Sequence, residues 1–229
     1  MHNVETIPAT ANEPIVNVNQ WKGYFLDRDI PRRLKSGALV LDAGCADGKE
    51  LRALQAQGFR TVGFDVDWAS LQICRNQGFQ TFLARAEEVP LRTASVDGLT
   101  FTVVMQLTDE ARVLGEFARV LKPGGFAYLS YHGWGYYLKY LTSRTSNWRQ
   151  RILGLRSLVN AWWYVVTGRR LPGFWGDSLY QSPSRLARYY RRYGLILEQK
   201  WEARTFAGTL VFIFHVVRTK QSVSATTKL

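Results

Sequence analysis

The chain contains 229 residues, 46% of them hydrophobic, and carries a formal net charge of +12 at pH 7. This length fits one large domain, and the two cysteines, Cys45 and Cys74, do not stand at a spacing typical of metal ligands. No apolar run reaches the roughly 20 residues of a membrane-spanning helix, and the polar N-terminal segment lacks the apolar centre of a signal peptide. We therefore expect a cytoplasmic protein without a metal site.

The charge is distributed unevenly along the chain. Residues 1–131 contain 14 Lys and Arg against 15 Asp and Glu, a net charge of −1. Residues 132–229 contain 16 Lys and Arg against 3 Asp and Glu, a net charge of +13. A field of this kind attracts anionic partners, which include phosphate-bearing substrates, a lipid headgroup surface and nucleic acid.

Taken in chain order, the sequence predicts a disordered tail over residues 1–16 and one domain over residues 17–218. The domain opens with an amphipathic helix at 21–35, interrupted by Pro31. Strand patterns then alternate with helix patterns, which is typical of a mostly parallel sheet covered by helices on both faces. The strands are expected at 38–43, 60–66, 80–84, 97–104 and 125–131, and the helices at 49–57, 68–77 and 109–121.

Two further strand patterns close the domain, at 195–201 and 209–217. Their connection is short, so they are expected to pair antiparallel. The residues that follow, 219–229, read as a polar tail.

An insertion separates the fifth strand pattern from the sixth. A helix pattern at 186–193 takes the usual crossover position, which leaves residues 132–178 as the insertion. Five of the eight tryptophans lie in it, and apolar residues recur there at spacings of four and three, which predicts one long helix. This apolar stripe consists of Trp148, Ile152, Leu155, Val159, Trp162 and Val166, with Arg149, Arg151 and Arg156 around it.

Three interpretations of the insertion stay open. It could be a cap whose tryptophans pack as core, or a lid that selects a large apolar or lipid-like substrate and lies in a membrane interface. It could also bind nucleic acid, with arginines on phosphates and aromatic rings stacked on bases.

The segment Leu39–Gly48 carries the most specific signal in the chain. A short apolar strand runs into a turn that contains Gly44 and Gly48, and a helix pattern follows at once. Glycines let a loop pass close to a ligand, and the helix points its positive end into the same space. The next strand ends at Asp65, at a spacing that suits a ribose-binding carboxylate.

This turn reads Asp42-x-Gly44-x-Ala46-x-Gly48 and resembles the DxGxGxG loop of class I S-adenosylmethionine (SAM) methyltransferases. Residues 85–91 with 95–99 resemble a second motif of that family, and residues 116–125 resemble its ExxRVLKPGG run. The combination is similar to the UbiE-like, type 11 branch. It implies a Rossmann-like sheet of seven strands, mostly parallel, with a final antiparallel hairpin and SAM as cofactor.

The resemblance also implies a set of cofactor-binding residues. Asp65 would accept hydrogen bonds from both ribose hydroxyls, and Asp42 would orient the cofactor through loop amides or its ammonium group. Cys45 is interpreted as a small residue that fits the loop, not as a reactive thiol. The full expected set is Asp42, Gly44, Cys45, Gly48, Asp65, Val66, Ala86, Glu87, Thr102 and Val103.

Two positions depart from the family pattern. Ala46 replaces a glycine, which is tolerable if the φ angle of that residue is negative. Arg85 stands where relatives usually carry an aspartate for the adenine amino group, and arginine cannot accept that hydrogen bond. The backbone of Ala86 and the side chain of Glu87 would then have to substitute for it.

A general base is harder to read from this sequence. His132 is the first candidate, because it follows the fifth strand on the ligand side of the sheet and its pKa range suits proton transfer. The competitors are Tyr131, Asp177 and Tyr24, whereas His215 reads as a packed strand residue.

The resemblance implies an enzyme that transfers a methyl group to a small-molecule or lipid-like acceptor through oxygen, nitrogen or carbon. An anionic membrane surface is an expected partner, with the protein peripheral to the inner face of a membrane. The alternatives are an RNA methyltransferase that uses the basic C-terminal half and a non-catalytic SAM-fold scaffold.

Overall fold

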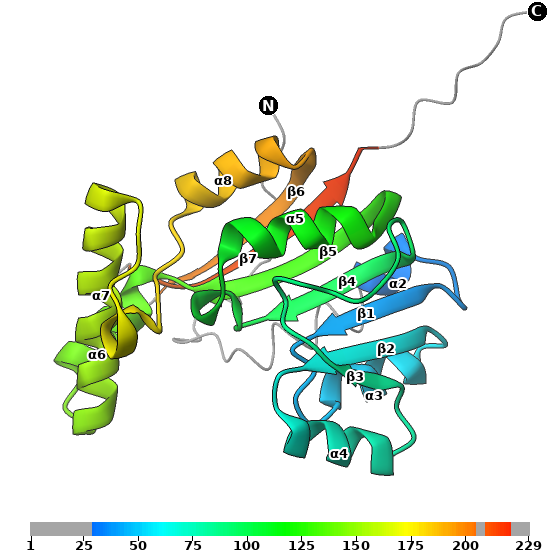
Figure 1. Ribbon diagram of the computed structural model, residues 1–229, viewed down its shortest axis with the longest axis horizontal. Coiled ribbons are helices and arrows are strands. Elements are labelled where there is room, and N and C mark those ends of the chain that lie inside the picture. Colours follow the sequence, from blue (N-terminus) through cyan, green and yellow to red (C-terminus); the bar gives the residue numbers. More distant parts are fainter. Residues whose placement is uncertain (1–28, 205–208, 221–229) are drawn as a thin grey trace, which may run out of the picture.

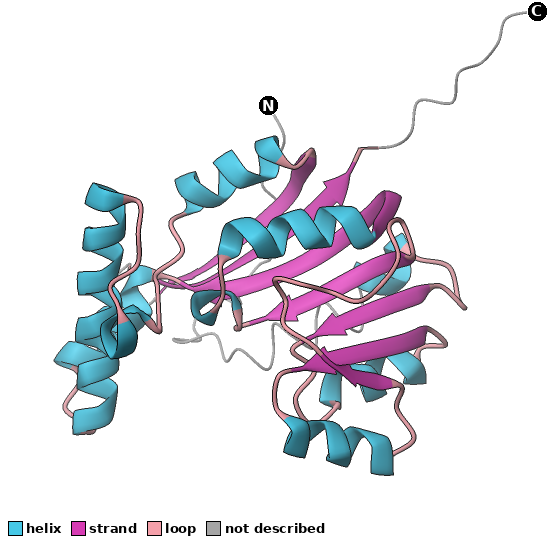
Figure 2. Ribbon diagram, in the orientation of Figure 1, coloured by secondary structure: helices cyan, strands magenta, loops and turns pink. Residues whose placement is uncertain are grey.

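The computed structural model describes residues 29–204 and 209–220, which form one sheet with helices on both of its faces (Figures 1 and 2). The sheet has seven strands in the order β3 (Thr81–Leu83), β2 (Arg60–Asp65), β1 (Leu39–Ala43), β4 (Val96–Thr102), β5 (Leu121–His132), β7 (Leu210–Thr219) and β6 (Leu195–Arg204). The first five strands pair in parallel, and β7 pairs antiparallel with both β5 and β6. The predicted Rossmann-like fold with a final antiparallel hairpin is confirmed.

The helices cover the two faces of this sheet. Those on one face are α2 (Ile30–Arg33), α3 (Lys49–Ala56) and α4 (Trp68–Asn76), and those on the other are α5 (Glu110–Val120) and α8 (Pro183–Arg192). Neighbouring residues of β1 alternate between the faces, as the pleat of a strand requires. Val40 belongs to the apolar cluster that contains Leu54 of α3, whereas Leu41 belongs to the cluster that contains Leu114 and Phe117 of α5.

The strand order fixes where a ligand can bind. β1 lies between β2 and β4, so the chain leaves β1 toward one side and β3 toward the other. In open α/β sheets, the crevice at the carboxyl ends of the strands on either side of such a reversal is the usual ligand site. The fold therefore places the glycine-containing turn after β1 at the mouth of this crevice.

Some predicted boundaries differ from the structure. β5 begins at Leu121, four residues before the expected start, because Leu121 pairs with Val96 ahead of an irregularity in the ladder. Pro31 does not interrupt a helix in the described part of the chain: it stands in the first turn of α2, where its missing N–H is not needed. The predicted tail 1–16, most of the predicted tail 219–229 and most of the predicted helix at 21–35 lie outside the described residues. The start of the second tail was predicted one residue too early, because β7 extends to Thr219.

Residues 133–178, called the cap below, follow the carboxyl end of β5. The cap contains α6 (Trp134–Thr142), α7 (Trp148–Thr167) and the short 3-10 helix η3 (Gly173–Gly176). In Figure 1, α6 and α7 lie beyond one end of the sheet. The predicted long helix is confirmed as α7, which contains the whole stripe from Trp148 to Val166, whereas α6 was not predicted. α8 then packs against α5 and β6 in the crossover position, as expected.

The apolar stripe of α7 faces away from the rest of the protein. The buried residues of this helix are Gly154, Ser157, Asn160 and Ala161, on the opposite side from the stripe. The five cap tryptophans, Trp134, Trp148, Trp162, Trp163 and Trp175, are all exposed. The interpretation of these tryptophans as core is therefore wrong, because small and polar residues take the buried positions of α7.

Candidate cofactor site

A pocket opens at the carboxyl ends of β1, β2 and β4 and encloses about 570 Å³ including its open mouth. Its walls come from the turn after β1, the end of β2, the loop after β3 and the 3-10 helix η2 (Met105–Leu107). The lining residues are Gly44, Phe64, Asp65, Val66, Ala84, Arg85, Ala86, Glu87, Phe101, Val104, Leu107 and Thr108. The pocket thus brings together five of the ten predicted cofactor residues.

Gly44 lines the pocket at the point where the turn passes closest to η2. A Cβ at this position would lie 2.9 Å from a methyl carbon of Val104, and the φ angle of Gly44 is +71°. The N–H groups of Gly44 and Cys45 both donate to the carbonyl oxygen of Phe64, at 2.8 and 2.9 Å. The turn therefore presents a bare backbone to the pocket, while these two amides bind β2 and do not face a ligand.

Cys45 and Gly48 are not among the lining residues of the pocket. Cys45 is buried in a cluster with Leu51, Leu71 and Cys74, and burial raises the pKa of its thiol far above the ordinary value, with the charge of Asp42 acting in the same direction. The thiol is therefore protonated and unreactive, which supports its interpretation as a small packing residue. Gly48 has a φ angle of +83° and begins α3, and a Cβ there would approach the thiol of Cys74 to 3.0 Å.

Ala46 has a φ angle of +43°, so the condition of a negative φ, under which alanine would replace glycine without strain, is not met. A residue with a Cβ loses roughly 1 kcal/mol in this left-handed region. Two hydrogen bonds hold it there: its N–H donates to Oδ2 of Asp65 at 2.9 Å, and its carbonyl accepts from Sγ of Cys74 at 3.1 Å. Ala46 thus adopts the backbone conformation that a glycine would take at this position.

Asp65 is the last residue of β2 and lines the pocket. Its Oδ2 accepts from Ala46 and its Oδ1 accepts from the N–H of Asp67 at 2.9 Å. Each carboxylate oxygen has a second lone pair, so Asp65 can hold the turn and still accept hydrogen bonds from two hydroxyls of a ribose. Asp67, the other carboxylate after β2, caps α4 by accepting from Ala69 and Ser70 and is not among the lining residues.

Asp42 lies below the pocket. It is buried, and its Oδ1 accepts from the hydroxyl of Thr100 on β4 at 2.8 Å. This bond joins β1 to β4 directly under the turn. The side chain therefore supports the turn from beneath, and its predicted contact with the cofactor ammonium stays a prediction.

The end of β4 places its residues differently from the expectation. Thr102 and Val103 are not among the lining residues, whereas Val104, Leu107 and Thr108 are. Val103 has a φ angle of +59° and donates its N–H to Ser130 of β5, which bends the chain into η2. Sequence reasoning missed these three residues because it extended the strand to 104 and did not predict the 3-10 turn.

Arg85, Ala86 and Glu87 form the wall expected to meet the adenine. Glu87 is buried, accepts from the N–H of Asp109 at 2.9 Å and lies 3.6 Å from the guanidinium of Arg85. Its carboxylate is thereby anchored to the start of α5, facing the pocket. This position is compatible with a contact to the adenine amino group, which stays a prediction.

His132 ends β5 as expected, but it does not line the pocket. Its ring stacks on Tyr136 of α6 with centroids 3.6 Å apart and contacts Phe212 of β7 at 5.1 Å. Burial lowers the pKa of His132 to about 4, so the ring is neutral at pH 7. Its assignment as general base stays a prediction, and the base would have to act from an aromatic cluster.

The competing bases occupy other surroundings. The hydroxyl of Tyr131 is buried and bonded to His215, at 3.0 Å from Nε2, and Nδ1 of His215 also lies 2.8 Å from the hydroxyl of Tyr190. This group is part of the core, which confirms that His215 is a packed strand residue. Asp177 lies in the cap, 3.4 Å from the guanidinium of Arg156, and Tyr24 lies outside the described residues.

Comparison with known proteins finds a family match that ends before the cap. Residues 41–129 match a family model described as a methyltransferase domain, Methyltransf_11. A tRNA (carboxymethyluridine(34)-5-O)-methyltransferase of Arabidopsis thaliana is 34% identical over 101 residues, which cover 42% of this chain and 24% of that protein. A probable SAM-dependent methyltransferase of Mycolicibacterium smegmatis is 34% identical over 126 residues, covering 52% of this chain and 46% of that one. The chain thus spans less than half the length of these curated relatives.

Solved structures share the fold over most of the chain. A SAM-dependent methyltransferase from Methanosarcina mazei has a TM-score of 0.62 at 17% identity, covering 85% of this chain and 98% of that one. A geranyl diphosphate methyltransferase in complex with SAM has a TM-score of 0.62 at 14% identity, covering 87% and 84%.

The turn around Gly44 and the free lone pairs of Asp65 fit SAM as cofactor, in agreement with the motifs and the family match. Residues 41–129 are thus similar to the methyltransferase domains of the type 11 family, and the described residues share the fold of SAM-dependent methyltransferases.

Proposed function

We propose that this protein transfers the methyl group of SAM to a small-molecule or lipid-like acceptor. The observation that carries the proposal is the pocket at the ends of β1, β2 and β4, with Gly44 and Asp65 in its wall. SAM supplies an electrophilic methyl on a good, neutral leaving group. The protein has to align the acceptor with that methyl and exclude water, which demands a shaped and closed site more than a reactive side chain.

The acceptor is expected to bind on the side of the pocket where η2 and the cap meet. Leu107 of η2 lines the pocket, and the carbonyls on either side of it, of Gln106 and Thr108, accept from the guanidinium of Arg170 in the cap. The N–H of Leu179, just after the cap, also donates to Gln106 at 3.0 Å. The cap is thereby fastened to one wall of the cofactor pocket, which supports a role in selecting the acceptor.

The walls on this side are largely apolar. Phe101, Val104 and Leu107 line the pocket there, and Leu107 is exposed. A buried apolar wall gains free energy from an apolar acceptor and gives a polar one little to bind. These side chains favour an acceptor with a hydrocarbon portion.

RNA methylation is the second candidate. It is supported by relatives named as tRNA methyltransferases, among them ALKBH8 of Macaca fascicularis at 38% identity over 100 residues. The net charge of +13 over residues 132–229 suits a polyanionic substrate. Those 100 residues cover 42% of this chain and 15% of that protein, so the likeness supports the shared domain more than a shared substrate.

Calorimetric titration with S-adenosylhomocysteine tests the cofactor site. We expect Asp65→Ala to weaken binding about 10- to 100-fold, because hydrogen bonds to a charged group contribute roughly 1.5–3 kcal/mol. Asp67→Ala is the matched control: it removes the α4 cap at a cost of about 1 kcal/mol in stability and leaves the affinity nearly unchanged. Absence of binding to the wild-type chain would favour the non-catalytic scaffold.

Transfer of radiolabelled methyl from SAM separates the acceptor classes. The protein is incubated with a lipid extract and, in parallel, with total tRNA. Label recovered in the organic phase supports the proposal, whereas label precipitated with tRNA establishes the second candidate in its place. Asp65→Ala should abolish either signal, which ties the transfer to the described pocket.

A further inference from the structure

The outer face of α7 is a continuous exposed apolar surface. Its members stand at successive spacings of four and three residues, so they share one side of the helix. Trp148 near its start is 66% exposed and Trp162 near its end is 65% exposed. A helix of 20 residues is about 30 Å long. The outer α7 face comprises Trp148, Ile152, Leu155, Val159, Trp162 and Val166.

The inner side of α7 fixes the helix in this orientation. A Cβ at Gly154 would lie 2.6 Å from the backbone carbonyl oxygen of Tyr137, so α6 and α7 touch there. The amide of Asn160 donates to the carbonyl of Ser178 at 2.9 Å and accepts from the N–H of Leu171 at 2.9 Å. Rotating the helix to bury its apolar side would leave these buried polar groups unpaired, so the exposed surface is built into the fold.

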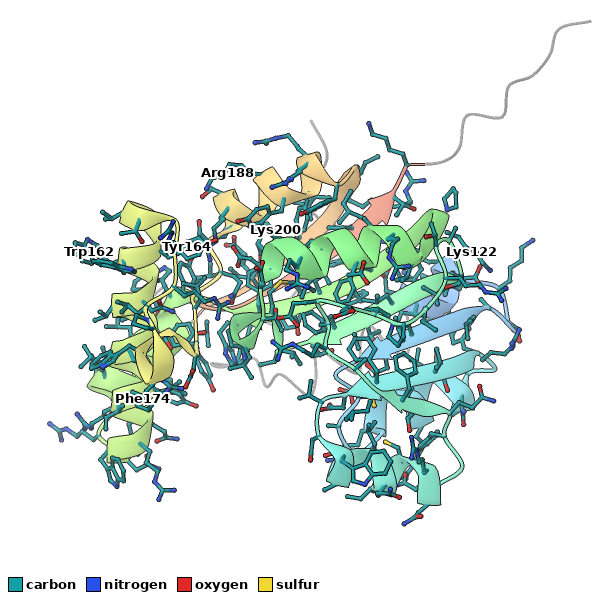
Figure 3. The ribbon with its side chains drawn as sticks, in the orientation of Figure 1. Lys122, Trp162, Tyr164, Phe174, Arg188 and Lys200 are labelled. Carbon is teal, nitrogen blue, oxygen red and sulfur yellow. The ribbon has the colours of Figure 1, made fainter. Side chains whose placement is uncertain are left out.

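Figure 3 shows the two sides directly. The indole of Trp162 points away from the body of the protein, whereas Tyr164 lies on the side facing α8. The hydroxyl of Tyr164 is 3.4 Å from that of Tyr189 on α8, and the guanidinium of Arg185 lies over its ring. Trp162 and Tyr164 are two residues apart in α7, yet the ring of Tyr164 packs against α8 whereas the ring of Trp162 is exposed.

Basic side chains border the outer α7 face. Residues 134–178 contain seven Lys and Arg and a single acid, Asp177, which is paired with Arg156. Arg149 lies over the ring of Trp148, and Arg156 over that of Phe174, which is itself exposed. The exposed cations of the cap are Lys139, Arg144, Arg149, Arg151 and Arg169. An apolar strip edged by cations matches a surface with a hydrocarbon interior and anionic headgroups.

The same features disfavour other occupants. A second copy of the chain would bring its own basic border against this one, and like charges at close range repel. RNA would stack bases on aromatic rings, but Ile152, Leu155, Val159 and Val166 have no ring and would be buried against a polar backbone. None of the helices within residues 29–204 and 209–220 combines the length and apolar character needed to cross a bilayer.

We propose that the outer α7 face docks on an anionic membrane surface, with α7 lying parallel to the membrane plane, its tryptophans among the headgroups and its arginines on lipid phosphates. This docking is separate from the proposed methyl transfer, since it involves none of the pocket residues. If both hold, the cofactor pocket opens beside the membrane and lipid-like acceptors reach it from there.

Vesicle cosedimentation of the full chain tests the docking. The vesicles contain phosphatidylcholine alone or with about one third phosphatidylglycerol, an anionic lipid. We expect binding to the anionic vesicles at least about tenfold stronger than to the neutral ones, and weakened by added salt. The double variant Trp148→Ser/Trp162→Ser should lose about tenfold or more of this binding.

Trp68→Ser is the matched control, because Trp68 is an exposed tryptophan stacked on an arginine, Arg75, at the other end of the sheet. It should bind vesicles like the wild type. All variants should keep their affinity for S-adenosylhomocysteine, which shows that they are folded and separates this test from that of the methyl transfer.

Three results would overturn the docking. One is that anionic vesicles fail to bind the wild type, or bind the Trp148→Ser/Trp162→Ser variant equally well. Another is a dimer that this variant dissociates, which would make a second copy the occupant. The third is tRNA binding that the variant loses and that vesicles do not displace, which would make the face an RNA site.

Discussion

The sheet and the cap use apolar side chains in opposite ways. In β1, Val40 and Leu41 are both buried, one on each face of the sheet, and the helices over them turn their apolar sides inward. In α7, the apolar side is exposed, and a glycine, a serine and an asparagine make the inward contacts. The difference shows that apolar periodicity identifies one face of a helix but does not tell whether that face is buried or exposed.

The two regions also differ in what holds them. The sheet is stabilised by apolar clusters on both faces. The cap is held to the rest by the hydrogen bonds of Arg170 and by the aromatic contacts of Tyr136 and Tyr164. Inside the cap, Asn160 joins α7 by hydrogen bonds to the segment after it. Changes that remove the buried polar groups of α7 should therefore destabilise the protein more than changes that remove the exposed apolar groups of this helix.

The sharpest test of this comparison is Asn160→Ala. Asn160 is fully buried, and its loss leaves the carbonyl of Ser178 and the N–H of Leu171 without their partner. We expect a loss of about 2–4 kcal/mol in the free energy of unfolding, measured with urea. Trp162→Ala, in the same helix, should change it by about 0.5 kcal/mol or less because that side chain is exposed. The opposite order would mean that apolar packing holds the cap.

The pH dependence of stability probes the junction between sheet and cap at His132. Its pKa of about 4 lies below the ordinary value of about 6.5, so between these values the unfolded chain takes up a proton that the folded chain does not. Stability is therefore complete above pH 6.5 and falls as the pH is lowered. His132→Phe keeps a ring against Tyr136 and removes the titration. The loss of stability between pH 7 and 5 should shrink by about 2 kcal/mol.

Unfolding in urea at the two pH values measures this difference. His215 is buried too, with a pKa lowered to about 3 by its burial, and it contributes equally to both chains. An unchanged pH dependence in His132→Phe would show that water reaches His132, and would strengthen its assignment as general base.

The smallest effect is expected at Ala46, which occupies a position in the turn after β1 whose positive φ angle favours glycine. Ala46→Gly removes the steric cost of a positive φ angle and should raise the free energy of unfolding by about 1 kcal/mol, less the entropy that glycine adds to the unfolded chain. Ala94→Gly is a control, since Ala94 also has a positive φ angle, +53°, away from the pocket. A loss of stability in Ala46→Gly alone would mean that the methyl group of Ala46 packs favourably.

The fold and half of the candidate site could be predicted from the sequence because their signals are local. Strand and helix periods placed the sheet, and the spacing from Gly44 to Asp65 brought both residues to one pocket. Val104 and Leu107 could not be predicted, since their positions depend on the positive φ angle of Val103. The sign of φ at Ala46 depends on Asp65 and Cys74, and the direction of the α7 stripe depends on the partners of Asn160.

The hydrogen bonds from Arg170 to the carbonyls of Gln106 and Thr108, on either side of Leu107, have a thermodynamic consequence. Leu107 and Thr108 line the pocket while Gln106 and Thr108 bind the cap, so a displacement of the cap moves a wall of the pocket, and the reverse also holds. Linkage then requires reciprocity: the factor by which membrane contact changes the affinity for SAM equals the factor by which SAM changes the affinity for the membrane. Titrating cofactor in the presence and absence of vesicles would measure that single number from both directions.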